Sequence, residues 1–481
     1  STGTGIEFVG TGYAISGSAT STGSFGSIQM PGLSIGDQSN VILGKNAGNA
    51  ISSGDVNNVL IGENAGLSIN AGEGNAIIGF STGDALTSGD LNTAIGYFAL
   101  STSTDVDRVV AIGTEAMEAG NVTSAADGTV AIGSKALQVL TSGAANVAIG
   151  LEAGKETTIG DYNVYIGYQA AYRTAGLNNQ YNTMVGYQAG AGDWTSGASN
   201  NNTALGAFAM GGGALNASVN NVCVGYSAGY LLTTGDQNTA VGYQALVSAQ
   251  TSQANVAIGY FALEELTFNG NSYNTAVGME AGRELTTGIK NVFIGGFAGQ
   301  NSTDVDQSVL IGYGAGDSIL TSDADGTVGI GAFAASTITS GIGNVAVGYE
   351  ALKVEDDGDQ NTAIGYQTLT DQTGTTGTVG NTALGYKAGK GVVKGTRNTF
   401  IGTESGLVAS ASSAIDNVGV GAISLKAMVS GSSNTAVGTW AAQQMVNASK
   451  TVAIGYYTLG NALTSTDIDG SVAIGYTSQA E

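Results

Sequence analysis

The side chains that could perform acid–base chemistry in this 481-residue chain are carboxylates, because the sequence contains no histidine. A Ser-His-Asp triad therefore cannot be assembled, and the usual zinc sites are excluded. Paired carboxylates can hydrolyse glycosides, with one group as general acid and the other as base or nucleophile. Charged side chains of this kind are usually solvated in turns, so we expect no catalytic site and no enzyme. The sequence places carboxylates together at Glu115 with Glu118, at Glu264 with Glu265, and along Glu355-Asp356-Asp357.

Aspartates two residues apart suggest another kind of site, a calcium loop. Calcium binds carboxylate and carbonyl oxygens, and an EF-hand loop closes with an acidic residue at a fixed position. That closing residue is missing here, and aspartate is also a common capping residue of turns. We therefore expect turn capping and no cofactor. Calcium stays open as the alternative for four pairs: Asp105/Asp107, Asp304/Asp306, Asp323/Asp325 and Asp467/Asp469.

The composition excludes several classes of protein. With 78 glycines, one proline, 11% charged and 42% hydrophobic residues, the chain is predicted to be a folded scaffold of small side chains. Its net charge of −23 argues against binding nucleic acid or anionic membranes, because both need a positive protein surface. No apolar run of about 18 residues is present, so we expect no insertion into a membrane. The single cysteine, Cys223, cannot form an internal disulfide and is predicted to be a small buried side chain.

The elements that carry these side chains come from one repeated unit, Asn-(Thr/Val)-Ala-(Ile/Val)-Gly-Tyr-x-Ala-(Gly/Leu). Its central glycine recurs 25 times between Gly44 and Gly475; 14 of the 24 intervals are 17 residues long and the others are 18 to 20. Regular repeats of this length are typical of solenoids, in which each unit is one coil. The positions that define the coil are represented by Asn92, Gly96, Tyr97, Ala99, Asn146, Gly150, Asn238, Gly242, Tyr243, Ala245, Asn344, Gly348, Asn434 and Gly438.

The unit predicts β-structure rather than helix. β-Branched residues and glycine fill each motif, and no 3.6-residue period is sustained. A unit of 17 to 20 residues suits one turn of a parallel β-helix or β-roll, made of two short strands and two turns. Because neighbouring strands lie about 4.8 Å apart, 25 coils would form a rod roughly 120 Å long. Several long intervals recur 53 or 54 residues apart, which indicates that three coils form a larger unit of duplication.

Stacking of such coils predicts three columns of like residues along the rod. Asparagine begins the motif in 19 copies, and its amide can link one coil to the next as a ladder. The third residue after the glycine is Ala, Ser or Thr, as a crowded corner requires. Tyrosine follows the glycine in 12 copies and is expected to form an interrupted aromatic stack.

The strand is apolar on both faces, which predicts self-association. Ile, Val or Leu precedes the glycine, and Val or Thr usually lies two places earlier, so these side chains share one face. The residue between them is mostly alanine and belongs to the other face, which we expect to form a long apolar stripe outside the roll. Such a stripe needs a covering partner, most simply further copies of the chain. Replacing Ala240 or Ala257 by tryptophan is therefore expected to prevent oligomer assembly.

The repeat resembles those of two kinds of fibrous protein. The core seen in Asn146-Val147-Ala148-Ile149-Gly150 and Ser471-Val472-Ala473-Ile474-Gly475, followed by a small-residue corner, resembles the YadA-like head of trimeric autotransporter adhesins. That resemblance implies left-handed β-rolls packed as a homotrimer over residues 37–481. The fuller form Asn-Thr-Ala-Ile-Gly-Tyr-x-Ala-Leu is similar to repeats in bacteriophage tail-fibre proteins. Residues 1–36 are predicted to be a separate N-terminal cap or connector, with Pro31-Gly32 at the junction.

These observations predict a non-enzymatic structural fibre and adhesin. The favoured interpretation is a phage tail fibre or related virion fibre that attaches to a host receptor or glycan. The alternative is a trimeric adhesin head on a bacterial cell surface, which would bind host or matrix ligands. A polysaccharide depolymerase would need an acidic cleft on an insertion, yet no interval exceeds 20 residues. An ice-binding solenoid would need regular outward Thr-x-Thr rows, and threonine alternates irregularly with valine here.

Overall fold

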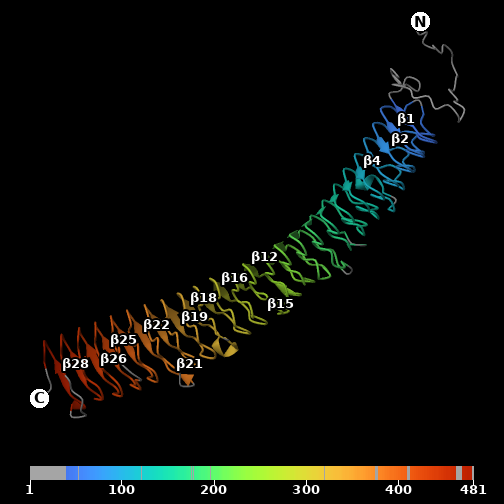
Figure 1. Ribbon diagram of the computed structural model, residues 1–481. Coiled ribbons are helices and arrows are strands. Elements are labelled where there is room, and N and C mark those ends of the chain that lie inside the picture. The colour runs from blue at the N-terminus through green and yellow to red at the C-terminus, as the bar shows by residue number, and fades with distance from the viewer. Residues whose placement is uncertain are drawn as a thin grey trace, which may run out of the picture.

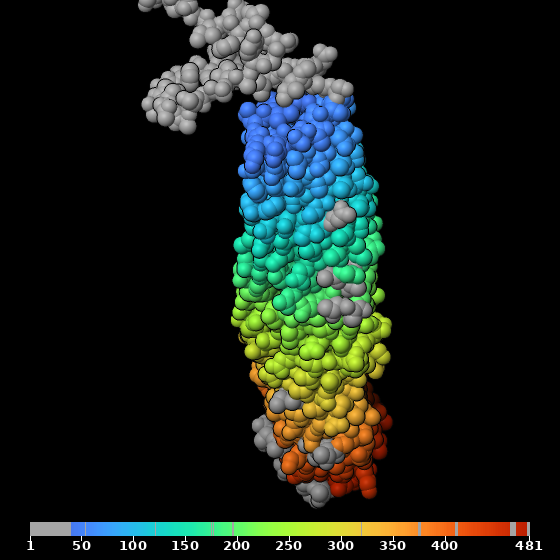
Figure 2. Space-filling view, turned by 90° about the vertical axis from the view of Figure 1, so that its right-hand side faces the viewer, coloured from blue at the N-terminus to red at the C-terminus, as the bar shows by residue number. Residues whose placement is uncertain are grey.

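The computed structural model describes residues 40–478, apart from 53, 121, 175, 177, 195–196, 319, 374–376, 409–411 and 462–467. The described chain is an all-β parallel solenoid of about 24 turns, whose coils follow one another in a single curved row (Figure 1). Figure 2 shows the coils packed against each other as one continuous column, from the blue to the red end. A solenoid is thus present throughout the described residues, whereas the predicted boundary at 37 and the predicted connector, 1–36, lie outside them.

Each coil contributes one three-residue strand to a single sheet of 25 strands. The strands are β1 (Val41–Leu43), β2 (Val59–Ile61), β3 (Ala76–Ile78), β4 (Thr93–Ile95), β5 (Val110–Ile112), β6 (Val130–Ile132), β7 (Val147–Ile149), β8 (Val164–Ile166), β9 (Thr183–Val185), β10 (Thr203–Leu205), β11 (Val222–Val224), β12 (Thr239–Val241), β14 (Val256–Ile258), β16 (Thr275–Val277), β17 (Val292–Ile294), β18 (Val309–Ile311), β19 (Val328–Ile330), β20 (Val345–Val347), β22 (Thr362–Ile364), β24 (Thr382–Leu384), β25 (Thr399–Ile401), β26 (Val418–Val420), β27 (Thr435–Val437), β28 (Val452–Ile454) and β29 (Val472–Ile474).

Successive strands pair in parallel and in the register of the repeat. In β12 and β14, for example, Ala240 lies opposite Ala257 and Val241 opposite Ile258. A second strand forms in only four described coils, as the pairs β13 (Ser252–Gln253) with β15 (Gly270–Asn271) and β21 (Gly358–Asp359) with β23 (Gly377–Thr378). The expectation of two strands in every coil is therefore wrong. Elsewhere among the described coils, the second halves of successive coils are joined by backbone hydrogen bonds between turns and by isolated parallel bridges, such as that of Val392 with Ser412.

The described chain contains two named single turns of 3-10 helix, η1 (Ser124–Ala126) and η2 (Ser322–Ala324), and Ile468 also has 3-10 conformation. Each of the two named turns follows a copy of the segment Ser-Thr-Asp-Val-Asp, which occurs at 103–107 and again at 302–306. The duplication visible in the sequence thus returns as the same local backbone. Nothing helical in the described residues has the length and apolar composition of a membrane span.

The central glycine sets how closely two coils approach. In the described coils its φ lies in the positive range, for example +139° at Gly242. A Cβ added to Gly242 would collide with the backbone carbonyl of Gly259 in the next coil, 2.6 Å from the carbonyl carbon. Such a separation is far inside van der Waals contact, and an L side chain rarely adopts this φ. The coil spacing therefore requires glycine at the central position.

The alanine in the middle of each strand points into the roll, so the expected outward alanine stripe is wrong. Ala240 and Ala257 are 0% exposed in the single chain, and both belong to the continuous apolar core. The same core includes the small corner residue after the glycine, such as Ala245, and larger side chains from the second half of the coil, such as Leu232. The roll is thin, so its strand layer admits mostly small side chains. Tryptophan at Ala240 would now be expected to disrupt the coil itself.

The predicted asparagine ladder is confirmed inside one edge of the roll. The amide nitrogen of Asn75 donates to the carbonyl of Gly89 at 2.8 Å and to Oδ1 of Asn58 at 3.1 Å. The backbone N–H of Asn75 donates to the same Oδ1 at 2.9 Å. Asn92 repeats this pattern one coil later on Asn75. Each buried amide thus satisfies backbone groups in its own coil and in the next.

The lone cysteine also lies where its size predicts. Cys223 is the middle residue of β11 and occupies the position that alanine takes in most strands. Burial raises the pKa of its thiol to about 12, so the group stays protonated at neutral pH. The prediction of a small buried side chain is confirmed.

Candidate interaction surface

The outward face of the long sheet is apolar and carries no charge. The first residue of each strand is Val, Thr or Ala and the third is Ile, Val or Leu, so neither position holds Asp, Glu, Lys or Arg in any of the 25 strands. These side chains are half-exposed rather than buried, as at Ile258 (38%) and Ile294 (37%). We name this surface the strand face. Monomeric proteins usually expose apolar residues singly or in small patches, whereas this apolar surface continues along all 25 strands.

The tyrosines after the central glycine form an aromatic column beside the strand face. Tyr226, Tyr243 and Tyr260 stack in succession, with ring centroids 5.2 and 5.3 Å apart and interplanar angles of 10° and 17°. The same arrangement links Tyr349 with Tyr366. The predicted interrupted stack is confirmed, and its rings are exposed on the surface of the single chain.

The carboxylate pairs considered for catalysis link neighbouring coils. Glu115 and Glu118 both accept hydrogen bonds from the amide of Gln138, at 3.0 and 3.1 Å. Glu264 forms an ion pair with Arg283 in the next coil, with 2.7 Å between Oε2 and Nε, while the adjacent Glu265 is exposed. These contacts give the charged side chains a structural role between coils.

The Asp-x-Asp pairs form turn caps that also run from coil to coil. Asp107 accepts the backbone N–H of Asp90 at 2.8 Å, and Asp325 accepts that of Asp306 at 2.7 Å. Asp469 accepts the backbone N–H of Ser449 at 2.8 Å. The turn-capping prediction is confirmed for the second aspartate of each pair: Asp107, Asp306, Asp325 and Asp469. Asp467 lies outside the described residues.

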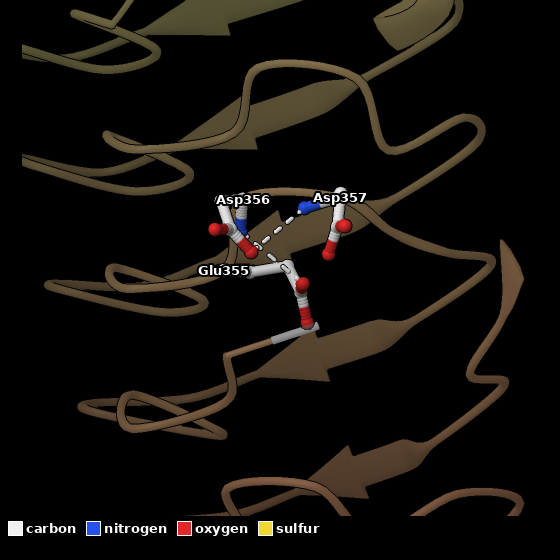
Figure 3. A group of neighbouring side chains, drawn as sticks. All are labelled: Glu355, Asp356 and Asp357. Carbon is white, nitrogen blue, oxygen red and sulfur yellow. Dashed lines mark hydrogen bonds between the residues drawn. The ribbon is translucent and has the colours of Figure 1, made fainter. Parts of the chain in front are cut away.

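One acidic cluster brings three carboxylates close together among the described residues. Oxygens of Glu355, Asp356 and Asp357 lie within 4.8 Å of one another (Figure 3). Glu355 Oε1 accepts the backbone N–H groups of Asp356 at 3.2 Å and of Gly358 at 2.8 Å. Asp356 in turn accepts the backbone N–H of Asp357 at 3.0 Å. Glu355 and Asp356 thus hold their own turn by accepting backbone N–H groups.

For Glu355, the environment predicted from the sequence is wrong. It was predicted to be a solvated turn charge, yet it is 0% exposed. It lies seven residues after its central glycine, where the preceding coil places the core residue Ile338 and the following coil the buried Gln372. That alignment was the signal for burial. Desolvation raises the pKa of Glu355 from 4.5 to about 6.

This burial predicts a stability that depends on pH. Because the folded pKa of Glu355 lies above its unfolded value of 4.5, its contribution is most favourable below about pH 4.5 and declines until about pH 6. The loss amounts to about 2 kcal/mol at neutral pH. Glu355→Gln should remove that part of the pH dependence, measured by hydrogen exchange of residues 345–372 between about pH 4 and about pH 7. The exposed Glu265→Gln is the control, and equal pH profiles for all three proteins would contradict the expected effect.

The chain was compared with protein families and with curated proteins. No family model and no curated protein matches the chain.

Proposed function

We propose that this chain is a non-enzymatic structural fibre that assembles through its strand face and serves in host attachment, as a phage tail fibre or related virion fibre does. The uncharged apolar face along all 25 strands carries the proposal. A chain with net charge −23 repels its own copies, and an interface free of charged residues avoids burying that charge. The stoichiometry of three rests on the resemblance to trimeric adhesin heads.

The shape of the solenoid supports the same role. Stacked coils extend in one direction only, so the chain spans a distance that a compact domain of equal length would not reach. Its half-exposed Ile, Val and Leu side chains repeat at the strand spacing. A further copy of the chain offers the same spacing, so apolar side chains of two copies can interdigitate along the whole contact.

Charge placed on the strand face tests the assembly. In the double variant Ile258→Glu with Ile294→Glu, each carboxylate would be desolvated in the interface. The molecular mass in solution should therefore fall from three times the chain mass of 47.6 kDa to that of a single chain. Light scattering gives the mass, and circular dichroism checks that the sheet remains. The control is Gln250→Glu, which adds charge on an exposed turn. A monomeric wild-type protein, or a double variant that assembles normally, would refute the strand-face interface.

The alternative, an adhesin head on a bacterial surface, uses the same assembly. The phage interpretation is preferred for the fuller repeat, seen at Asn92–Leu100 and Asn238–Leu246. An antibody against the chain separates the two, because it should label virions in one case and the cell surface in the other.

A further inference from the structure

A groove lies where three consecutive intervals of the repeat exceed 17 residues, between Gly167 and Gly225. It has a volume of about 470 Å³, and its lining residues include Tyr172, Arg173, Gln188, Asp193, Phe208 and Tyr230. Glycines that offer no side chain, Gly211 and Gly212 among them, also line the hollow. The lining residues follow the central glycines and do not belong to the strands, so the groove is separate from the strand face.

A second hollow of about 290 Å³ adjoins the first. The two share Phe208 and Tyr230, and the second continues along the aromatic column past Tyr226 and Tyr243. Together they span coils β8 to β12, a length of about 20 Å at the strand spacing. A ligand that filled both would be an extended chain, and it would contact several aromatic rings in succession.

The aromatic rings of the groove are fixed in place by their neighbours. Phe208 contacts Tyr187, Tyr226 and Tyr230 edge to face, with ring centroids 5.2, 5.8 and 6.4 Å apart. The ring of Tyr230 lies directly over Gly212, where an added Cβ would collide with it. Phe208 and Tyr230 are each half-buried, so part of each ring stays available to a ligand.

The polar groups of the groove are paired and nearly neutral in sum. Arg173 donates a hydrogen bond to Asp193 of the neighbouring coil at 2.9 Å, and this pair is exposed to solvent. Gln188 donates to Gln169 at 2.7 Å, and no described residue donates to the Gln188 amide oxygen. Amide, guanidinium and carboxylate groups offer both donors and acceptors, which hydroxyl groups of a ligand can use together.

We propose that this groove binds a neutral oligosaccharide, with sugar C–H faces on Phe208 and Tyr230 and sugar hydroxyls on Gln188 and the Arg173–Asp193 pair. An apolar peptide fits poorly, because the lining is mostly polar. An acidic polymer is disfavoured by the net charge of −23 and by the prior pairing of Arg173. The inference rests on the proposed attachment function and supplies its ligand class.

The test is an array of neutral and acidic glycans exposed to the 481-residue chain, followed by titration of the strongest neutral hit in solution. Wild-type protein should bind neutral oligosaccharides, and Phe208→Ala should weaken binding about tenfold or more, as the loss of one aromatic anchor does. Phe333→Ala is the matched control. Phe333 holds the same position after its central glycine, has φ of 56° against 60° for Phe208, and also packs edge to face on a tyrosine.

The possible results distinguish a failure of the groove proposal from a failure of the fibre proposal. Failure to bind any neutral glycan, binding of acidic glycans only, or equal affinities for wild type and Phe208→Ala would each overturn the groove assignment. A trimeric, elongated protein with one of those results would leave the fibre proposal standing. A monomeric protein that binds neutral glycans through Phe208 would instead overturn the fibre proposal and leave the groove in place.

Discussion

Gly242→Ala is expected to destabilise its coil by about 4 kcal/mol, a loss large enough to open the stack locally. The added Cβ would collide with the backbone of Gly259, and alanine would be forced to hold φ near +139°. Neither neighbour can move without breaking a hydrogen bond of the ladder, because the N–H of Gly259 donates to the carbonyl of Val241 at 2.8 Å. Hydrogen exchange of residues 225–278 in the native protein measures the local opening.

Gly475→Ala separates the collision from the backbone strain. Gly475 has φ of +128°, but the nearest atom to an added Cβ is Ser478 Oγ at 3.9 Å. This variant should therefore lose only about 1 to 3 kcal/mol, the cost of the φ value alone. Equal losses in the two variants would show that coil spacing does not require glycine at the central position.

Asn238→Ala is expected to cost about 3 to 5 kcal/mol, because it leaves several buried backbone groups without partners. Asn238 Nδ2 donates to the carbonyl of Ser252 at 2.8 Å, and its Oδ1 accepts the backbone N–H of Asn255 at 3.0 Å. Both partners are fully buried, so water cannot replace the lost amide. Unfolding in urea, followed by circular dichroism, measures the loss.

Asn238→Thr is the matched comparison for this ladder. Threonine occupies the same position at Thr129, where its hydroxyl donates to the carbonyl of Gly143 at 3.2 Å, 14 residues further on. Ser252 lies 14 residues after Asn238, so threonine there can restore that hydrogen bond. Asn238→Thr should lose no more than about half as much as Asn238→Ala. The ladder would not be stabilising in the way described if both substitutions had the same small effect.

Much of the fold could be predicted because each position of the coil is repeated many times. Twenty-five copies of the glycine, 19 of the asparagine and 12 of the tyrosine predict parallel stacking, the amide ladder and the aromatic column from the sequence alone. The inward face was predicted wrongly, because alternation shows that a strand has two apolar faces but not which one encloses the core. Threonine in place of valine at the first strand position was the available clue, since a hydroxyl is better tolerated on the half-exposed side.

Other features depend on contacts that the repeat pattern does not contain. The residue two places after the central glycine has positive φ although it is seldom glycine, as at Gln244 (52°) and Phe261 (55°). Propensity does not favour that conformation, so the stacked neighbours must impose it. The groove at Phe208 likewise arises from three longer coils and their glycines, whose relative positions in space no single repeat defines.

The unvarying register of strand pairing also governs how such a chain changes in size. Every step from one strand to the next repeats the same offset, so duplication of a three-coil block of 53 or 54 residues adds about 14 Å to the rod. The sides of the rod keep their pattern through such a change, because the inserted block meets its neighbours as any coil does. Reach can therefore be adjusted in fixed increments by recombination between repeats, without redesign of the surfaces that meet a partner or a ligand.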